Sequence, residues 1–477
     1  MQNLDTRSKW AYSIGAVGRD MAYTLVSMFL LTYIQYTVQL SVAQFSAISI
    51  VMVLALVWDA INDLLMGMLI ENSQLKYGKY KPWILAGAIL NSVVIILLFS
   101  VRPTGWAFVA YFALIYIGWG MTYTMNDIAY YGMLPSLTSD PKKRNSLVTL
   151  MNIFVSIGQF SVAVIVPMLV AGNAIVAYRK IALAVALAFV IFQLITVLGV
   201  KERERRENQD KLTLNKMYQI FKNNDQLVYI GLAALFFYIG SGLLILFAMN
   251  FFYFEFGYGQ SGGLITIFTV MYGLGTLLSQ FAFSPLVDKL GRNKLIKIMV
   301  FSLVILYLLF LSLGYILAKS AVLIYIIGFA IFFFQGLGTL LMVVMINNTI
   351  EYDELKHGHR HESVISGVRS FAVKLATGIN QLIVALVLIV SGIYSISQKI
   401  SGLELEVGLA KMTSETALKQ ANLFIGQVTR GQTFLLRLGI VIFPIFSFII
   451  MYQLIKKHYI IDEAMYLDIL SQLDHRD

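Results

Sequence analysis

Long apolar stretches recur along the whole chain, and short polar segments separate them. Most of these stretches are long enough to cross a hydrocarbon core of ~30 Å as a helix of about 20 residues. They are uniformly apolar and do not alternate, so they predict membrane helices and exclude a transmembrane barrel. The predicted spans cover residues 10–38, 44–70, 82–101, 106–134, 147–171, 178–199, 227–254, 262–285, 294–317, 320–349, 364–393 and 433–455.

Basic residues concentrate in every second loop between these spans. This positive-inside pattern places those loops, the N-terminus and the tail at Lys456 and Lys457 in the cytoplasm. The long polar loop 394–432 then lies outside, and its residues 403–412 predict a helix on the membrane surface. The basic residues are Lys76, Lys79 and Lys81 after the second span, Lys142, Lys143 and Arg144 after the fourth, the charged segment 201–225 after the sixth, and Lys289, Arg292, Lys294 and Lys297 after the eighth.

The composition supports a polytopic membrane protein. Of 477 residues, 58% are hydrophobic and 13% are charged, and the mean hydropathy is +0.75. Cysteine is absent, which excludes disulfides, thiolate metal sites and cysteine nucleophiles. The formal net charge is +10, but its location in short loops argues against a nucleic-acid partner. Residues 1–9 are polar and a long apolar run follows them, so we expect a first helix that is retained rather than cleaved.

The charged segment 201–226 is predicted to be a cytoplasmic linker. It would join an N-terminal six-helix bundle, residues 1–200, to a C-terminal six-helix bundle, residues 227–477, which includes the outside loop. A weak repeat supports this division, because Gly78-Lys79 follows the second span and Gly291-Arg292 follows the eighth. Two six-helix halves with such a repeat resemble the major facilitator superfamily. In that architecture the substrate lies between the halves near the midplane, and access alternates by rocking.

Two acidic residues lie one helical turn apart inside the second span. A carboxylate at mid-membrane costs roughly 2.5–3.5 kcal/mol on insertion scales, so something must offset that cost. Asp59, Asn62 and Asp63 have the spacing i, i+3, i+4, which places all three on one face of a helix. Such hard oxygen ligands suit Na⁺, Li⁺ or H⁺, so the pattern predicts a cation site. The alternative is a structural ion pair with Lys374 or Arg19.

Polar residues also interrupt the first, fourth and eleventh spans. They include Arg19 and Asp20, then Tyr123 and Asp127, and finally Lys374. Acids from several helices and a lysine from the other half predict a polar interior cavity. Such a cavity suits a neutral polyol such as a sugar, because carboxylates accept hydrogen bonds from hydroxyls, basic groups donate them, and aromatic rings stack on the sugar face.

Three segments make the resemblance more specific: Trp58–Asp63 (WDAIND), Gly78–Trp83 (GKYKPW) and Thr122–Asp127 (TYTMND). Together they resemble the glycoside–pentoside–hexuronide:cation symporter family of the major facilitator superfamily, over most of the chain from Arg19 to Lys374. The resemblance implies an all-α membrane protein with twelve transmembrane helices. It also implies symport of a glycoside or related sugar with Na⁺, Li⁺ or H⁺, and no other cofactor.

The family pattern implies roles for individual residues. The implied cation site consists of Asp59, Asn62, Asp63 and Thr124. The implied sugar site contains Arg19, Asp20, Asp127, Tyr131 and Lys374, and Lys374 also links the two sites. We expect Tyr123, Asn152 and Ser370 to belong to the sugar site as well.

The chain departs from the family pattern at three positions, two of which lie in the implied sugar site. Tyr131 stands where the family has Trp, which reduces the stacking area and adds a hydroxyl. Asn152 stands where an Arg on the fifth helix is usual, which removes up to five donors and a fixed charge. Asn348 stands where an Asp is usual. Substrate preference, or the balance of the buried acids, must therefore differ, and the family's sugar does not transfer to this chain.

Other functions fit the sequence less well than transport of a sugar. A membrane enzyme is disfavoured, because no HExxH, nucleophile elbow or P-loop occurs at a suitable position. A non-transporting sugar sensor on the same scaffold would explain the missing arginine. Distant relatives of the family move lysolipids, although several cavity acids favour sugar.

We expect a monomer in a bacterial cytoplasmic membrane, with membrane lipids around it and both termini in the cytoplasm. His357, His359 and His361 lie among Arg and Glu in a cytoplasmic loop, so they predict a solvated face rather than a metal tract.

Overall fold

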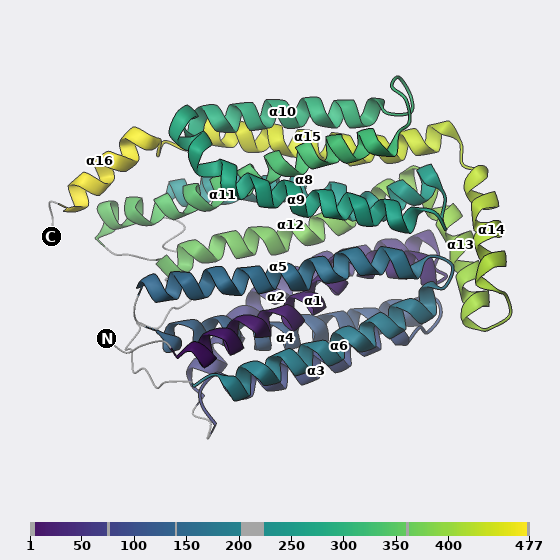
Figure 1. Ribbon diagram of the computed structural model, residues 1–477, viewed down its shortest axis with the longest axis horizontal. Helices are drawn as coiled ribbons and strands as arrows, with labels where there is room; N and C mark the ends of the chain where they lie inside the picture. The colour runs from purple at the N-terminus through teal and green to yellow at the C-terminus, as the bar shows by residue number, and fades with distance from the viewer. Residues whose placement is uncertain (1–4, 74–76, 139–140, 202–223, 359–361, 475–477) are drawn as a thin grey trace. The chain divides into compact units, whose positions relative to one another are not determined.

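The structure is a computed structural model that describes residues 5–73, 77–138, 141–201, 224–358 and 362–474. The described residues form helices joined by short turns (Figure 1). The helices are α1 (Thr6–Thr37), α2 (Val42–Glu71), α3 (Lys81–Ser100), α4 (Trp106–Leu137), α5 (Pro141–Val170), α6 (Ala174–Gly199), α8 (Asp225–Phe256), α9 (Ser261–Leu290), α10 (Arg292–Ser312), α11 (Ala321–His357), α12 (Glu362–Val390), α13 (Ile393–Gly408), α14 (Ser414–Gly426), α15 (Arg430–His458) and α16 (Glu463–Asp474).

Twelve helices of the described chain are long and apolar enough to cross a membrane, which confirms the predicted spans. Several boundaries differ by more than a turn, and for two of them a glycine explains the difference. The helix α10 ends at Ser312 rather than at 317, because Gly314 adopts a φ of 80° and the chain turns there. The helix α11 continues to His357 rather than ending at 349, and Gly358 stops it with a φ of 74°.

The chain forms two compact units. Unit 1 consists of Met1–Asn208, Met249–Thr266 and Leu388–Thr433, and the remaining residues form unit 2. This grouping differs from a single division after residue 200, because the end of α8 and the start of α9 pack with the first six helices. Thr266 Oγ1 donates a hydrogen bond of 3.0 Å to the carbonyl of Val164 in α5. The predicted linker 201–226 lies largely outside the described residues.

Within unit 1, α1 packs against both α5 and α6, and α4 packs against α2 and α3. Small residues let these backbones approach closely. A Cβ added to Gly18 would lie 2.8 Å from the carbonyl oxygen of Ala188 in α6, and one added to Gly158 would collide with the carbonyl oxygen of Val17 in α1. The close approach of α1 and α5 fixes the position of the polar residues that α1 carries.

We predict that Gly158→Ala will lower the stability of the protein, because its new methyl has no space against Val17. Overpacking of this kind costs about 1–3 kcal/mol. Gly118→Ala in α4 is the matched control, since no atom lies within 4 Å of a Cβ added there. Thermal unfolding in detergent measures both variants. A Gly158→Ala melting temperature at or above that of Gly118→Ala would contradict the close packing.

The two glycine-basic turns of the weak repeat share a backbone feature. Gly78 precedes α3 with a φ of 109°, and Gly291 precedes α10 with a φ of 74°. Both values lie in the left-handed region that favours glycine. In unit 2 the turn at Gly291 also contacts α16, because the side chain of Glu463 accepts a hydrogen bond from the backbone N–H of Arg292.

The segment 394–432 differs from the predicted polar loop. It forms two helices, α13 and α14, and α13 packs against α1 and α6 within unit 1. The stretch predicted to be helical, 403–412, is only partly so, because α13 begins at Ile393 and ends at Gly408. Ala410 has a φ of 57°, which ends the helix in a turn. One side of α13 is buried against protein, because Ile393, Ser397, Ile400 and Glu404 recur at helical spacing on it, and its position on the membrane surface stays a prediction.

Candidate substrate and cation sites

The polar face of α2 lies against α4, as its spacing predicts. The hydroxyl Oγ1 of Thr124 donates a hydrogen bond of 2.9 Å to Oδ1 of Asp63. The carboxylate of Asp59 lies against Gly120, one turn earlier on α4, where an added Cβ would collide with Oδ1. Both acids of α2 therefore face the same side of α4, and the absence of a side chain at Gly120 makes room for one of them.

Asn62 completes this group between the two acids. Its side chain is 3% exposed, and its Nδ2 has no hydrogen-bond partner. This amide nitrogen is a donor, so it needs an acceptor such as water, while the oxygen of the same amide could face a cation. No group of three or more His, Cys, Asp or Glu suited to a metal occurs in the described chain. A cation here would be held by two carboxylates and neutral oxygens of Asn62 and Thr124, a donor set that fits a small monovalent ion.

We predict that Thr124→Val will weaken cation binding, because valine keeps the shape but removes the oxygen beside Asp63. Losing one such hydrogen bond to a charged group costs about 1.5–3 kcal/mol, so the cation concentration for half-maximal effect should rise by at least about tenfold. Thr124→Ser retains the hydroxyl and serves as the control. Titration of purified protein with Na⁺, Li⁺ and H⁺ measures both variants, and equal values for them would exclude Thr124 as a ligand.

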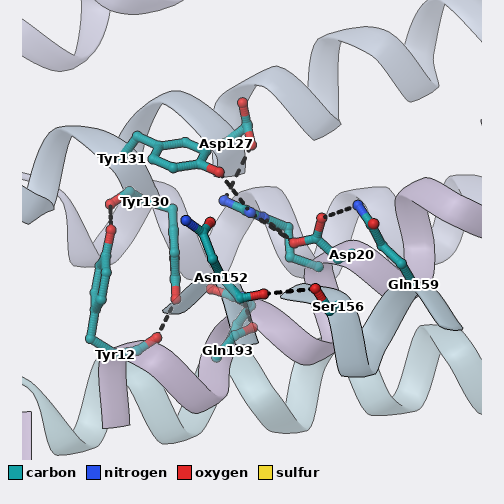
Figure 2. A network of polar contacts seen from close by, with 11 residues as sticks. Tyr12, Asp20, Asp127, Tyr130, Tyr131, Asn152, Ser156, Gln159 and Gln193 are labelled. Carbon is teal, nitrogen blue, oxygen red and sulfur yellow. Dashed lines mark hydrogen bonds and ion pairs between the residues drawn. The ribbon is translucent and has the colours of Figure 1, made fainter. Parts of the chain in front are cut away.

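A second polar group surrounds Arg19 of α1, whose side chain is 2% exposed (Figure 2). Its Nη2 lies 2.7 Å from Oδ2 of Asp20 and donates to the hydroxyl of Tyr131 at 3.1 Å. Its Nη1 lies 3.4 Å from Oδ1 of Asp127, an ion pair without hydrogen-bond alignment, so this buried nitrogen lacks a hydrogen-bond partner. The guanidinium thus joins α1 to α4 and retains a donor for a ligand.

Two tyrosines that the sequence analysis did not select hold α1 and α4 together beside Arg19. The hydroxyl of Tyr12 donates to the carbonyl of Tyr130 at 2.9 Å, and the hydroxyl of Tyr130 donates in return to the carbonyl of Tyr12. Their rings stack with centroids 4.4 Å apart. The guanidinium carbon of Arg19 lies 4.8 Å from the ring centroid of Tyr130 and 4.6 Å from that of Tyr131. Aromatic rings therefore enclose the cation from two sides.

Gln159 of α5 was not among the predicted site residues, yet its Nε2 donates a hydrogen bond of 3.2 Å to Oδ1 of Asp20. Figure 2 shows the carboxylate of Asp20 turned toward this amide. Gln159 is a polar residue in the apolar run of α5, and that position is a signal that could have selected it. Asp20 is thus bonded to both α1 and α5, and its part in a sugar site stays a prediction.

Aromatic rings line α4 next to Asp127. The ring of Tyr123 lies 5.5 Å from that of Tyr23 and 5.6 Å from that of Trp119. Trp119, Tyr123 and Asp127 are spaced by four residues, so they share one face of α4, and this spacing could have selected Trp119 from the sequence. Such a face offers stacking surface beside hydrogen-bonding groups, which suits a sugar ring.

The remaining predicted residues are placed as follows. Tyr131 is 44% exposed and bonds Arg19, so one ring face remains accessible. Asn152 is exposed on α5, its carbonyl accepts a hydrogen bond from Ser156, and Figure 2 shows its amide turned toward the polar network. Ser370 is exposed and Lys374 is half-buried on α12 of unit 2, and their parts in the sites of unit 1 stay predictions. Asn348, at the third departure from the family, is buried in α11.

Residues 11–463 match a protein family described as MFS/sugar transport protein. The chain belongs to this family. Its relatives also support the predicted glycoside–pentoside–hexuronide group within the superfamily. The chain is 25% identical to a lactose permease of Lactobacillus delbrueckii subsp. bulgaricus and 26% identical to a raffinose carrier protein of Pediococcus pentosaceus. These matches cover 81% and 80% of the chain, but only 63% and 62% of the relatives. A glucuronide carrier protein homolog of Escherichia coli is 26% identical, with 82% of the chain and 85% of the relative covered.

Solved structures share the fold of this family member. A bacterial homolog of the human lysosomal transporter Spinster, inward-facing and unoccupied, matches with a TM-score of 0.61 at 13% identity and 97% coverage of both chains. The nucleoside transporter NupG matches with a TM-score of 0.54 at 14% identity, covering 88% of this chain and 98% of that one. The protein is therefore an all-α, multi-pass membrane protein of the major facilitator type, and it belongs to a family of transporters rather than enzymes.

Proposed function

We propose that the protein is a secondary transporter that carries a glycoside or related sugar together with Na⁺, Li⁺ or H⁺ by alternating access. The observation that carries this proposal is that α4 contributes to both polar groups. Thr124 and Gly120 of α4 meet the acids of α2, whereas Tyr123, Asp127 and Tyr131 of α4 meet α1. A shift of this one helix changes both groups together.

This shared helix gives coupling a physical route. A cation bound by Asp59 and Asp63 neutralises the two carboxylates that face α4, and it thereby stabilises one position of α4. That placement also sets the distance from Asp127 to Arg19, and thus the donors and acceptors offered to a sugar. By linkage, the sugar must raise cation affinity by the same factor. One charge that moves inward through 100 mV adds about 2.3 kcal/mol of driving force.

The chemistry of the Arg19 group supports a sugar as the substrate. Buried Nη1 of Arg19 has no hydrogen-bond partner, and the accessible ring of Tyr131 lies beside it. A sugar hydroxyl would satisfy that donor, and the apolar face of a sugar ring would stack on the tyrosine. The relatives named for lactose, raffinose and glucuronides support the same substrate class. The missing arginine at Asn152 argues for a preference that differs from theirs.

We further propose that the protein lies in a bacterial cytoplasmic membrane, because the named relatives are bacterial. We also propose that it works as a monomer surrounded by membrane lipids. The basic loops support a cytoplasmic position for both termini. A role of Lys374 and Ser370 of α12 in sugar binding rests on the family resemblance alone.

The test is uptake into vesicles that contain the purified protein, with imposed Na⁺, Li⁺ or H⁺ gradients. The panel contains α- and β-glycosides, pentosides, glucuronides and one lysolipid, and protein-free vesicles are the control. Accumulation of a sugar driven by one cation supports the proposal. Sugar exchange without accumulation indicates a uniporter, sugar binding without flux indicates a sensor, and uptake of the lysolipid alone overturns the sugar assignment.

A further inference from the structure

Glu404 of α13 is a carboxylate buried at one end of unit 1, with 1% of its surface exposed. Its Oε2 accepts a hydrogen bond of 2.6 Å from the backbone N–H of Ala174, the first residue of α6. Its Oε1 accepts bonds from the backbone N–H of Gly172 at 2.7 Å and from the hydroxyl of Tyr258 at 2.8 Å. The positive end of the α6 dipole also favours a negative charge there. One side chain thus connects α13, the turn between α5 and α6, and the turn between α8 and α9.

The helices α13 and α14 also hold two further segments at this end of unit 1. Gln398 of α13 accepts a bond from the backbone N–H of Leu40 at 2.9 Å and donates to the carbonyl of Gln35 at 3.0 Å. Asn422 of α14 accepts a bond from the backbone N–H of Tyr258 at 2.9 Å. The end of α1 and the turn before α9 are therefore both attached to the segment that the sequence analysis treated as a loop.

Polar contacts lie among the apolar ones beneath α13, and these polar contacts are incompletely paired. Asn250 of α8 accepts bonds from Gln35 at 2.8 Å and from the hydroxyl of Tyr36 at 2.9 Å. Buried polar atoms without a hydrogen-bond partner remain close by in the same unit: Nδ2 of Asn250, Oε1 of Gln35, Oγ of Ser401 and the hydroxyls of Tyr178 and Tyr253. A permanent contact gains most from apolar packing, whereas an interface that parts repeatedly retains groups that water can solvate.

We propose that α13 is a latch that holds this end of unit 1 closed, and that Glu404 is the residue that fastens it. The inference rests on the proposed transport function. Alternating access requires the end of α8 and the start of α9 to part from the first six helices on one side. Tyr258, Asn250 and Thr266 belong to those segments, so they cannot move away while α13 and α14 hold the turn at Tyr258.

The energetics of Glu404 suit a latch that can be released. Burial raises the pKa of Glu404 above its ordinary value, while the hydrogen bonds from Ala174, Tyr258 and Gly172 lower it. The closed state therefore combines a desolvation cost with three compensating bonds. When α13 lifts, water replaces those bonds and the desolvation cost disappears, so the two changes oppose each other in the free energy of opening.

The first experiment uses the fact that the chain has no cysteine. Ser401→Cys places one thiol on the fully buried side of α13 with a small change in shape. We expect Glu404→Gln to raise the rate of maleimide labelling at this thiol by about tenfold, because one charged, triply bonded partner is lost. Tyr258→Phe should raise the rate by less. The measurement uses full-length protein in detergent without sugar, so it reports on the latch even if no panel substrate is transported.

The matched control is Glu415→Gln, which removes an exposed acid that pairs with Lys419 on α14. In the Ser401→Cys background, the labelling rate of Glu415→Gln should equal that of Ser401→Cys alone, which is the parent protein. An unchanged rate in Glu404→Gln, with thermal unfolding like that of the parent, overturns the latch. A rate that rises only in step with a lowered unfolding temperature assigns Glu404 a structural role and overturns it too.

The second experiment does not depend on the folding of the Glu404 variant. Leu40→Cys and Gln398→Cys together allow a short, reducible crosslinker to join α13 to the end of α1. If α13 must lift, crosslinking stops uptake of the sugar found in the vesicle assay, and reduction restores it. Full uptake by the crosslinked protein overturns the latch while leaving the transport function intact.

Discussion

Replacing Asp59 with cysteine will leave the protein able to bind sugar but will remove the effect of the cation on that binding. Asp59 supplies one of two carboxylates facing α4, and its oxygen occupies the space that Gly120 leaves open. Without it, the remaining oxygens cannot neutralise and coordinate a small ion. The ratio of sugar affinities with and without the cation, typically about 5–150 for coupled sites, should fall to about one.

The measurement is sugar binding to purified protein at rising Na⁺, Li⁺ or H⁺ concentration. Asp468→Asn, which removes an exposed acid on α16, is the control and should retain full stimulation. If Asp59→Cys is still stimulated like the parent, Asp59 is not a cation ligand. If it loses sugar binding altogether, the acid serves the structure or the sugar directly.

Replacing Arg19 with glutamine will lower sugar affinity by about 30-fold or more, because truncating one partner of a buried charge pair costs about 2–5 kcal/mol. The change removes the guanidinium that holds Asp20 and Tyr131 and faces Asp127. The buried acid Asp20 and the half-buried acid Asp127 then lose their cation, so the unfolding temperature should also fall. Calorimetric sugar binding and thermal unfolding measure the two effects separately.

A double variant distinguishes a sugar-binding role from a structural one. In Arg19→Gln with Asp127→Asn, one unpaired charge is gone, so part of the lost stability should return while sugar affinity stays low. Arg179→Gln, at an exposed position on α6, is the control for loss of a positive charge. Recovery of sugar binding together with stability would show that Arg19 acts only as a structural partner.

The sequence predicted most of the helical framework, since hydropathy is a property of each segment by itself. The spans at α1, α3 and α8 need no partner to be recognised as membrane helices. The spacing of Asp59, Asn62 and Asp63 likewise predicted a common face, and the resemblance supplied Thr124 as its partner. The structure places Thr124 beside Asp63, while the identity of any bound cation stays a prediction.

Residues whose partners lie far away in the sequence could not be predicted from local patterns. Tyr12 and Tyr130 exchange hydrogen bonds with each other's carbonyl groups, although 118 positions separate them. Gln159 reaches Asp20 only because α5 packs closely on α1 at Gly158. No local pattern specifies these partners, because any tyrosine or glutamine in an apolar helix has the same local signal.

The sequence by itself determined that the chain crosses a membrane as twelve helices and that carboxylates lie within them, since each follows from the free energy of transferring a segment into lipid. Only the tertiary structure decided which groups those carboxylates meet, and that a polar segment after α12 becomes a buried helix carrying Glu404. The physical reason is that a polar side chain can be buried only where donors or acceptors surround it. Here the backbone N–H groups of Gly172 and Ala174 and the hydroxyl of Tyr258 come together only when the chain has folded.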